Sequence, residues 1–270
     1  MDVQSKTIPA AGHHPDVKSD ARRVFEVLQA GGVALIPTEV GYGLMASSTE
    51  AIQKAFAAKR RRPGHAHGVI GTPRLHRELH ILSDEKFEMI RVLHEDMDMS
   101  FGIVAPFRTE HPILQQLTEA TLANTTKNGT LGMFISRSSL LVELGRLNDE
   151  AGQLMLGSSA NLTGRGQKFR VEDVDDEIKE AADIIVDYGL QKYHVYGGRA
   201  STIIDFENMT ALRMGSSYEL MRERLWKYWG VELPEDPMFD GSGSRKEEQP
   251  RKVEQKPVEE RKKKEVDEVM

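Results

Sequence analysis

Short apolar segments alternate along this chain with amphipathic segments of helical period. Residues 20–30 carry apolar side chains at helical spacing and end at two glycines, and the continuously apolar residues 33–36 follow directly. The alternation continues to residue 229 without a detectable internal repeat. Strands and helices that alternate in this way build layers around a sheet, so we predict an α/β fold with one sizeable sheet.

The spacing of apolar residues and the positions of Gly and Pro give the boundaries of the expected elements. We predict helices over residues 20–30, 50–59, 84–95, 140–147, 171–182 and 218–229. We predict strands over residues 33–36, 69–70, 101–107, 130–135, 154–156, 184–187 and 201–205. The Gly- and Ser-rich stretch that precedes the second helix predicts a loop.

The two ends of the chain differ in composition from its middle. Residues 241–270 hold 9 Lys and Arg, 8 Asp and Glu and no aromatic residue. Such a segment cannot bury enough apolar surface to offset the entropy of ordering it, so we predict a disordered charged tail. Residues 1–18 precede the first helix and predict a flexible arm. The folded domain, with its closing helix, is therefore expected over residues 19–240.

Composition excludes several classes of protein. The absence of cysteine excludes a disulfide framework, a thiolate metal site and a cysteine nucleophile. No run approaches the roughly 18 apolar residues that span a bilayer, and the first residues lack a basic start followed by an apolar stretch. We therefore expect a cytoplasmic protein without a membrane partner. The net charge of −6 argues against a nucleic-acid-binding surface all over the protein but permits a local basic cleft.

Two polar loops directly follow predicted strands, which is where α/β proteins place ligands. In the first loop, Thr38 offers a hydroxyl and Tyr42 an aromatic wall, although an ordinary strand-to-loop turn has the same composition. In the second, Ser159 and Asn161 could hold an anion or a purine edge, and a loop that caps its own backbone explains them equally well. Spacing alone leaves both pairs of interpretations open.

Four successive cations, residues 59–62, end the second predicted helix. Two or three of them could converge on a phosphate, for which Arg supplies a rigid fork. The alternative is a solvated helix end whose cations complement the negative end of the helix dipole. His65 and His67 follow with the spacing of a metal-ligand pair, but no third ligand lies nearby in sequence, so a solvated turn is the favoured interpretation.

Five motifs, taken in order, resemble the YrdC family, whose best-known members are threonylcarbamoyl-AMP synthases. They are GGVALIPTEVGYGLMA, a helix ending in AKRRRP, GSSANLTGRG, ADIIVDYG and STIIDFENMTALRMG. Together they cover roughly residues 20 to 215. The resemblance implies a single YrdC-like domain, in which a twisted mixed sheet with flanking helices carries an open concave cleft.

The resemblance also implies an activity. Family members carboxylate the amine of L-threonine with bicarbonate and transfer the carbamate to the α-phosphate of ATP. Threonylcarbamoyl-AMP and pyrophosphate result, and the adduct serves to modify an adenosine in tRNA. No protein nucleophile is required, because cations, Mg²⁺ and fixed dipoles can hold two anions together and stabilise charge at phosphorus.

Individual residues take their expected roles from the motifs that they match. Thr38, Tyr42 and Ser201 would bind the amino-acid substrate. ATP would be bound by Lys59, Arg61, Arg62, Ser159, Asn161 and Arg213. Within the basic cluster the helix register favours Lys59 and Arg61 as the phosphate-binding pair, whereas Pro63 as the anchor favours Arg60 and Arg62.

Three departures from the family pattern support an alternative function. Phe101 stands where a Thr is usual, Phe134 where an Arg is usual, and Gly71 ends a strand that often carries a His. Lost polar contacts would weaken anion binding, since each charge-assisted hydrogen bond contributes about 1.5–3 kcal/mol. The alternative is a YrdC-like module that binds double-stranded RNA, tRNA or a nucleotide without chemistry. A third possibility is an enzyme that adenylates a different carbamate.

Overall fold

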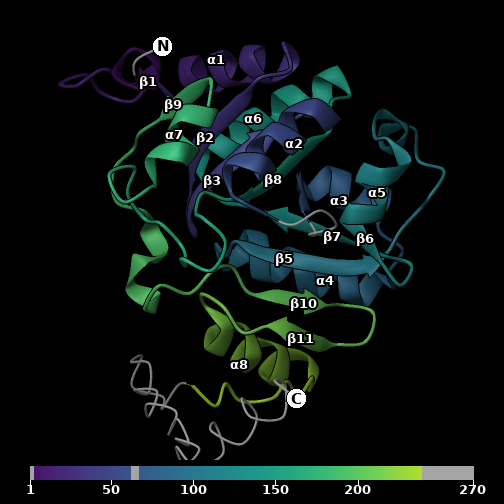
Figure 1. Cartoon of the computed structure of the whole chain (residues 1–270). Coiled ribbons are helices and arrows are strands. Elements are labelled where there is room, and N and C mark those ends of the chain that lie inside the picture. The colour runs from purple at the N-terminus through teal and green to yellow at the C-terminus, as the bar shows by residue number, and fades with distance from the viewer. Residues whose placement is uncertain (1–2, 62–66, 239–270) are drawn as a thin grey trace, which may run out of the picture. The chain divides into compact units, whose positions relative to one another are not determined.

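One large mixed sheet organises the part of the chain that the computed structural model describes, residues 3–61 and 67–238 (Figure 1). Its strands are β1 (Thr7–Ile8), β2 (Val33–Thr38), β3 (Gly41–Ala46), β4 (Gly68–Gly71), β5 (Phe101–Pro106), β6 (Thr126–Lys127), β7 (Thr130–Ile135), β8 (Met155–Ser159), β9 (Ile184–Val186), β10 (Ile203–Asp205) and β11 (Thr210–Arg213). The order across the sheet is β1-β9-β2-β3-β8-β4-β7-β5-β10-β11, with β6 paired to β7. Parallel and antiparallel pairs both occur, so the predicted α/β class with a mixed sheet is confirmed.

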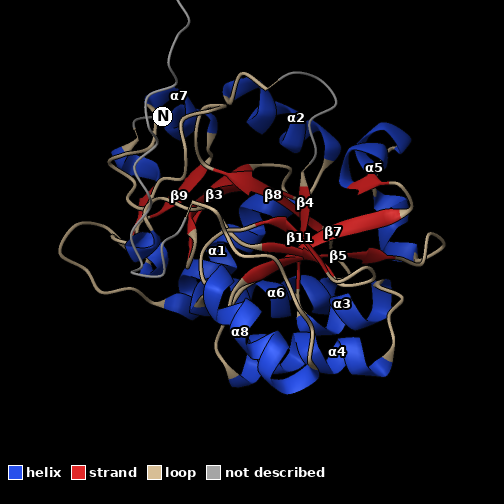
Figure 2. Ribbon diagram, turned by 90° about the horizontal axis from the view of Figure 1, so that it is seen from below, coloured by secondary structure: helices blue, strands red, loops and turns tan. Residues whose placement is uncertain are grey.

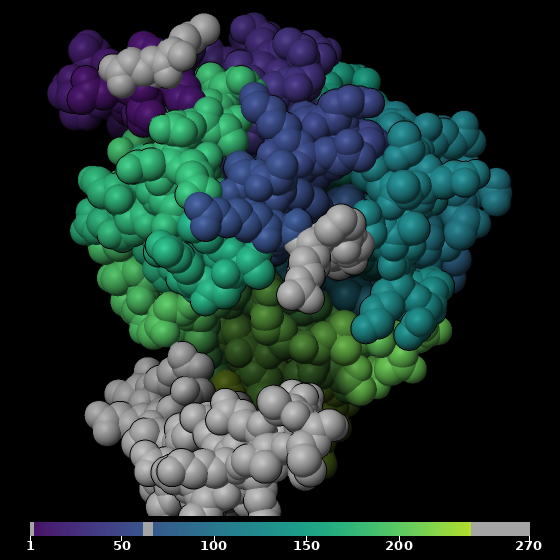
Figure 3. All heavy atoms as spheres, in the orientation of Figure 1, coloured from purple at the N-terminus to yellow at the C-terminus, as the bar shows by residue number. Residues whose placement is uncertain are grey.

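Helices cover both sides of the sheet. They are α1 (Val17–Gln29), α2 (Thr49–Ala58), α3 (Pro73–Leu79), α4 (Asp84–Arg91), α5 (Glu119–Thr125), α6 (Ser139–Ala151), α7 (Asp176–Ala181) and α8 (Tyr218–Trp229). Figure 2 shows α2, α5 and α7 on one side and α1, α3, α4, α6 and α8 on the other. α2 and α5 share one face of the molecule (Figure 3), and the hydroxyls of Thr49 and Thr121 lie 3.1 Å apart between them.

Local capping sets where the first helices begin. α1 starts three residues before the predicted position because the Asp16 carboxylate accepts a hydrogen bond from the Ser19 backbone N–H (3.1 Å). Asp20, with which the predicted helix begins, lies inside α1; it is buried and accepts a hydrogen bond from the Tyr188 hydroxyl (2.8 Å). α2 starts within one residue of the prediction, with the Ser48 side chain as its cap.

The hairpin of β2 and β3 positions the first polar loop, and β3 itself was not predicted because its glycines suggested a loop. Thr38 pairs with Gly41 across the turn, and Gly41 has a φ of 112°. A Cβ at this position would lie 2.6 Å from the Lys168 carbonyl oxygen, so a side chain is excluded there. β3 also pairs with β8 and places Gly43 opposite Ser159, so the hairpin lies beside the end of β8.

The two ends of the chain compare differently with the prediction. The N-terminal arm contains a strand that was not predicted, and the C-terminal tail cannot be compared. Within the predicted flexible arm, β1 pairs in parallel with β9, and Ile8 is 4% exposed. The predicted tail, residues 241–270, lies outside the described residues. By its contacts the chain divides into residues 1–236 and residues 237–270. In the described part, no helix combines the length and the apolar character that crossing a membrane requires.

Candidate functional site

Lys59, the residue that ends α2, joins the basic cluster to the end of β8. Its side chain is fully buried, and its Nζ donates to the Ser158 hydroxyl (2.7 Å) and to the Ser159 carbonyl oxygen. Burial, together with the nearby Arg61 charge, lowers the pKa of Lys59 to about 7. The Lys59 carbonyl oxygen accepts from the Thr163 backbone N–H (3.3 Å) and hydroxyl (3.1 Å), which ties the helix end to the loop after β8.

Asn161 belongs to the same loop, two residues beyond Ser159. Its side-chain amide donates to the Leu162 carbonyl oxygen (2.7 Å), and its backbone N–H donates to the Ser159 carbonyl oxygen (3.1 Å). The neighbouring Ala160 N–H donates to the Tyr42 carbonyl oxygen (2.8 Å). The structure therefore brings Lys59, Ser159 and Asn161 together, with the hairpin beside them.

The other cations of the cluster point in different directions. The Arg61 guanidinium carbon lies 5.1 Å from the centre of the Phe56 ring, and burial lowers the pKa of Arg61. Arg60 forms a surface ion pair with Glu177 of α7. Arg62 lies outside the described residues. Lys59 and Arg61 are thus near neighbours, whereas Arg60 is directed to another element.

Tyr42 is a core residue and not the exposed cleft wall that the sequence suggested. Its side chain is fully buried, and its hydroxyl lies 2.9 Å from the Gly189 carbonyl oxygen and 3.2 Å from the Asp187 carboxylate. Burial and then the Asp187 charge raise the pKa of Tyr42. Thr38 is also buried, with its hydroxyl donating to the Gly41 carbonyl oxygen (2.6 Å). Both side chains therefore hold the hairpin in shape.

Ser201 and Arg213 form a second polar pair, beside β10 and β11. The Arg213 Nε donates to the Ser201 carbonyl oxygen (2.6 Å), and its terminal nitrogen donates to the Ser201 hydroxyl (2.6 Å). The sequence assigned these two residues to different substrates. In the structure they act as one unit, because the fork of the guanidinium contacts two oxygens of one residue.

Glu39 and its partners were missing from the predicted site. One Glu39 carboxylate oxygen accepts from the Ser100 hydroxyl and the other from the Lys192 Nζ (2.9 Å). The Ser100 hydroxyl in turn accepts from the Arg137 backbone N–H (2.8 Å), and the Glu39 carbonyl oxygen accepts from the Tyr193 N–H (2.8 Å). The position of Glu39 in the Pro-Thr-Glu turn was the available signal. This network links the hairpin to the start of β5.

Of the two phenylalanines that depart from the family pattern, Phe101 is a core residue and Phe134 is partly buried. Phe101 is fully buried, with its ring 6.1 Å from that of Phe206. Phe134 packs against the cluster that α1 and α6 form with the sheet, which includes Leu140 and Leu144. The polar contacts that a Thr and an Arg would make at these positions are therefore absent, and the binding-module alternative stays a prediction.

His67 corrects the prediction of a solvated turn after the basic cluster. It is 6% exposed, and its backbone N–H donates to the carbonyl oxygen of Asn124, at the end of α5 (3.2 Å). Its ring centre lies 5.2 Å from that of Phe56. Because this placement buries the imidazole between α2 and α5, His67 belongs to the neighbourhood of Arg61. His65 lies outside the described residues.

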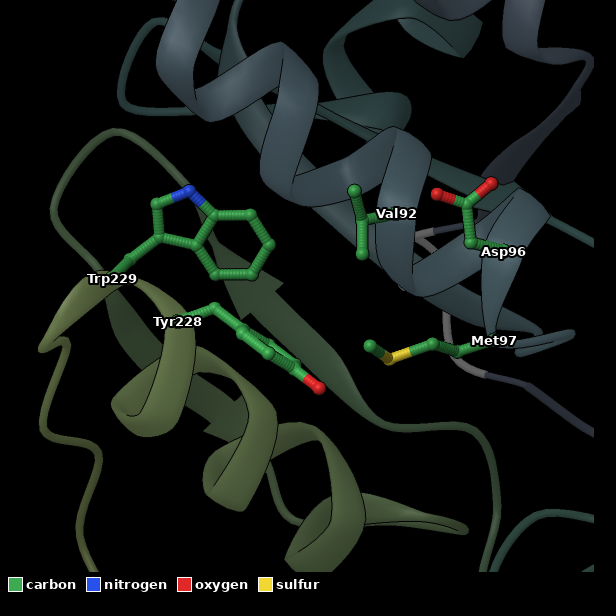
Figure 4. A pocket seen from close by; sticks show the side chains of 5 residues that line it. All are labelled: Val92, Asp96, Met97, Tyr228 and Trp229. Atoms are coloured by element: carbon green, nitrogen blue, oxygen red, sulfur yellow. The ribbon is translucent and has the colours of Figure 1, made fainter.

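A surface hollow of about 360 Å³ lies elsewhere, between the last helix and the segment after α4 (Figure 4). It is lined by Val92, Asp96, Met97, Tyr228 and Trp229. None of the predicted site residues lines it. Among the residues that the structure describes, no group of three or more His, Asp or Glu side chains could hold a metal ion.

One family model matches most of the chain. Residues 26–215 match the family model Sua5_yciO_yrdC, described as "Telomere recombination". No curated protein sequence matches the chain.

Solved structures show a similar fold. Sua5 from P. abyssi complexed with L-threonine aligns with a TM-score of 0.61 at 19% identity, over 84% of this chain and 64% of that one. A hypothetical protein from Streptococcus mutans UA159 aligns with a TM-score of 0.64 at 19% identity, over 84% of this chain and 96% of that one. HypF in a phosphate- and nucleotide-bound form aligns with a TM-score of 0.56 at 16% identity, over 77% of this chain and 25% of that one. At these identities the likeness shows the fold. The chain spans about two thirds or less of the Sua5 chain that it matches.

Proposed function

Because the chain belongs to the Sua5/YciO/YrdC family, we propose that it makes threonylcarbamoyl-AMP and pyrophosphate from L-threonine, bicarbonate and ATP. The product would serve in the cytosol to modify an adenosine in tRNA. The similar Sua5 structure contains L-threonine and the similar HypF structure contains a nucleotide, which supports the two substrate classes. We assign the activity to residues 19–240.

The environment of Lys59 is the observation that carries the proposal. Its ammonium group is fully buried and, within residues 3–61 and 67–238, contacts only the hydroxyls of Ser158 and Ser159 and one carbonyl oxygen. A buried cation without a carboxylate beside it is costly, and an anionic ligand would offset that cost. A phosphate group next to Lys59 and Arg61 meets this requirement.

The proposed reaction needs positioning and charge more than covalent help from the protein. The threonine nitrogen adds to the bicarbonate carbon, and water leaves. A carbamate oxygen then attacks the α-phosphorus of ATP, and the bond from that phosphorus to the pyrophosphate oxygen breaks. Lys59 and Arg61 would stabilise the charge on the phosphates, while Ser159 and Asn161 would hold the nucleotide.

The second polar pair suits the amino acid. The Arg213 guanidinium, already held against Ser201, would bind the threonine carboxylate. Mg²⁺ would supply charge neutralisation at the triphosphate, and the proposal assigns it no protein ligand. Glu39 would keep the hairpin and the start of β5 in register through Ser100.

Release of pyrophosphate from ATP tests the proposal on the full chain. We expect release in the presence of Mg²⁺ that requires both L-threonine and bicarbonate, and that falls in a Lys59→Met variant. Omitting bicarbonate from CO₂-depleted buffer and replacing L-threonine by D-threonine are the controls. Absence of release with all components present would remove the proposal, and RNA binding without release would favour the binding module.

A further inference from the structure

The His67 side chain is buried without a hydrogen bond. It is 6% exposed, and neither its Nδ1 nor its Nε2 has a hydrogen-bond partner in the described part of the chain. The other buried histidines of the described residues each have at least one: His76 and His80 bond to each other (2.7 Å), and His94 bonds to the Met99 carbonyl oxygen (2.9 Å). His67 is therefore an exception within this protein.

An unpartnered buried polar group is unfavourable. Leaving a buried donor or acceptor unsatisfied costs about 1–3 kcal/mol, and an aromatic hydrocarbon of similar size would avoid that cost. A phenylalanine could take the place of His67, since the His67 ring packs against Phe56 with an interplanar angle of 56°. A nitrogen-bearing ring at this place therefore calls for a partner from outside the chain.

The neighbouring charges define what kind of partner fits. Phe56 contacts His67 and lies under the Arg61 guanidinium, so the imidazole and the guanidinium flank one ring. Burial and the Arg61 charge lower the pKa of His67 to about 4, so the ring is neutral at pH 7 and carries one N–H donor. A neutral donor beside a guanidinium suits an oxyanion, to which both can donate.

We propose that His67 is a further ligand-contacting residue of this site, where its ring N–H donates to a phosphate oxygen of the nucleotide that Arg61 also contacts. The inference rests on the proposed function, because the nucleotide is its ligand. His67, which directly precedes β4 and lies next to α5, would then bind the same ligand as the basic cluster. Ligand binding then supplies the hydrogen bond that the ligand-free protein lacks.

The variant His67→Phe separates a ligand contact from a packing role. Phenylalanine keeps the contact with Phe56 and removes both nitrogens, so the ligand-free protein keeps or raises its melting temperature. Its affinity for Mg²⁺-ATP, measured by calorimetry, falls about tenfold, the loss expected for one hydrogen bond to a charged group. His67→Gln and His67→Asn place an amide donor near Nε2 and Nδ1 respectively, and one of them regains most of the affinity.

His76→Phe is the matched control. His76 is also buried with an unpartnered Nε2, but it lies on α3, on the other side of the sheet from α2 (Figure 2). Its replacement leaves the affinity for ATP unchanged. An equal affinity of wild type and His67→Phe for ATP would overturn the inference and leave the proposed function intact.

Inorganic pyrophosphate, as a second probe, keeps the two proposals distinguishable. If the wild type binds pyrophosphate through His67 but does not bind ATP, the phosphate contact stands and the synthesis of an adenylate is wrong. If the wild type binds neither probe, both proposals are wrong. If His67→Phe weakens both probes while His76→Phe weakens neither, the contact is supported directly.

Discussion

Two groups of buried nitrogen-bearing side chains differ in how their nitrogens are hydrogen-bonded. One group lies around the end of α2 and the other on and around α3 and α4, helices that cover opposite sides of the sheet (Figure 2). The α2-end group is Lys59, Arg61 and His67, and the α3-side group is His76, His80 and His94. In both groups burial lowers the pKa values. The α3-side histidines bond to each other or to backbone carbonyls, with His80 Nε2 3.2 Å from the Leu131 oxygen.

The α2-end group has weaker internal support. Among the described residues, the Lys59 Nζ contacts neutral oxygens only, and the His67 ring nitrogens have no hydrogen-bond partner. Each α3-side histidine has at least one bonded ring nitrogen, although His76 Nε2 has no partner in the part of the chain that the structure describes, so we infer that this group serves the fold and that Lys59 and His67 serve a ligand. The difference predicts that changes in the α2-end group alter ligand affinity and that changes in the α3-side group alter stability.

The largest expected effect on affinity comes from Lys59→Met. This variant keeps an unbranched side chain of similar length in the buried site and removes the charge. We expect the affinity for Mg²⁺-ATP to fall about 10- to 100-fold, because a charge-assisted hydrogen bond contributes about 1.5–3 kcal/mol. Calorimetry on the full chain measures it.

Lys54→Met is the control for that variant. Lys54 lies on the same helix but forms an exposed ion pair with Asp183, and such pairs contribute little. ATP affinity should stay within about twofold of the wild type. Equal losses in both variants would mean that Lys59 acts only through the net charge of α2, and the comparison between the two groups would then be wrong.

The α3-side group should control the response to acid. The pKa of His76 is about 3 in the folded protein, against an ordinary value of 6.5. The unfolded chain therefore binds more protons below pH 6.5, and stability is lost as the pH falls from 6.5 towards the folded-state value. At pH 5 one such histidine costs roughly 2 kcal/mol relative to pH 7.

The variant His76→Leu tests this assignment. Urea unfolding at pH 7 and at pH 5 should show a smaller loss of stability in the variant than in the wild type, by about 2 kcal/mol. ATP affinity at pH 7 should not change. An identical pH dependence in the two proteins would show that His76 is protonated in the folded state as readily as in the unfolded chain.

The sequence predicted the α/β class and the family because both depend on patterns that span the whole chain. Apolar periodicity gave α2 and α8 to within a residue at their starts, and five ordered motifs gave the family. It failed for β3, because Gly41 and Gly43 look like loop residues in the sequence although they belong to a strand; Gly41 is required by the hairpin turn and by the nearby Lys168 carbonyl oxygen. It also failed for β1, because a two-residue strand that pairs with β9 has no periodicity to detect.

The sequence nominated candidate site residues but not their arrangement, and their binding roles stay predictions. The motifs named Lys59, Ser159 and Asn161, which the structure brings together. They could not show that Tyr42 points into the core, since an aromatic residue between glycines looks the same in a cleft and in a buried strand. His67 was assigned to a solvated turn because burial between α2 and α5 depends on contacts distant in sequence.

The pH dependence of ATP binding tests the α2-end group, as the pH dependence of stability tests the α3-side group. The pKa of Lys59 is about 7 in the ligand-free protein, so Lys59 loses its proton as the pH rises above 7. A bound anion favours the charged form, so binding at higher pH takes up a proton. Between pH 7.5 and pH 8.5 we expect the affinity for ATP to fall about five- to tenfold.

Calorimetry in two buffers of different ionisation enthalpy measures that proton uptake directly. Lys59→Met should show neither the uptake nor the decline in affinity, and His76→Leu should show both. A pH-independent affinity of the wild type over this range would mean that Lys59 stays charged without a ligand. Its contacts with Ser158 and Ser159 would then be sufficient partners, as in the α3-side group.

The smallest expected effect comes from Arg60→Ala, and it decides between the two possible phosphate-binding pairs. Arg60 adjoins Lys59 in sequence, but its side chain is 70% exposed and pairs with Glu177. Removing an exposed ion pair of this kind changes stability little, and with Arg60 directed towards α7 the affinity for ATP should change less than about threefold. A tenfold loss, comparable with that of Lys59→Met, would instead place Arg60 at the phosphates. The end of α2 would then have to rotate on binding, because Arg60 and Arg61 now point to different elements, and the ligand-free positions of Lys59 and His67 would no longer describe the bound site.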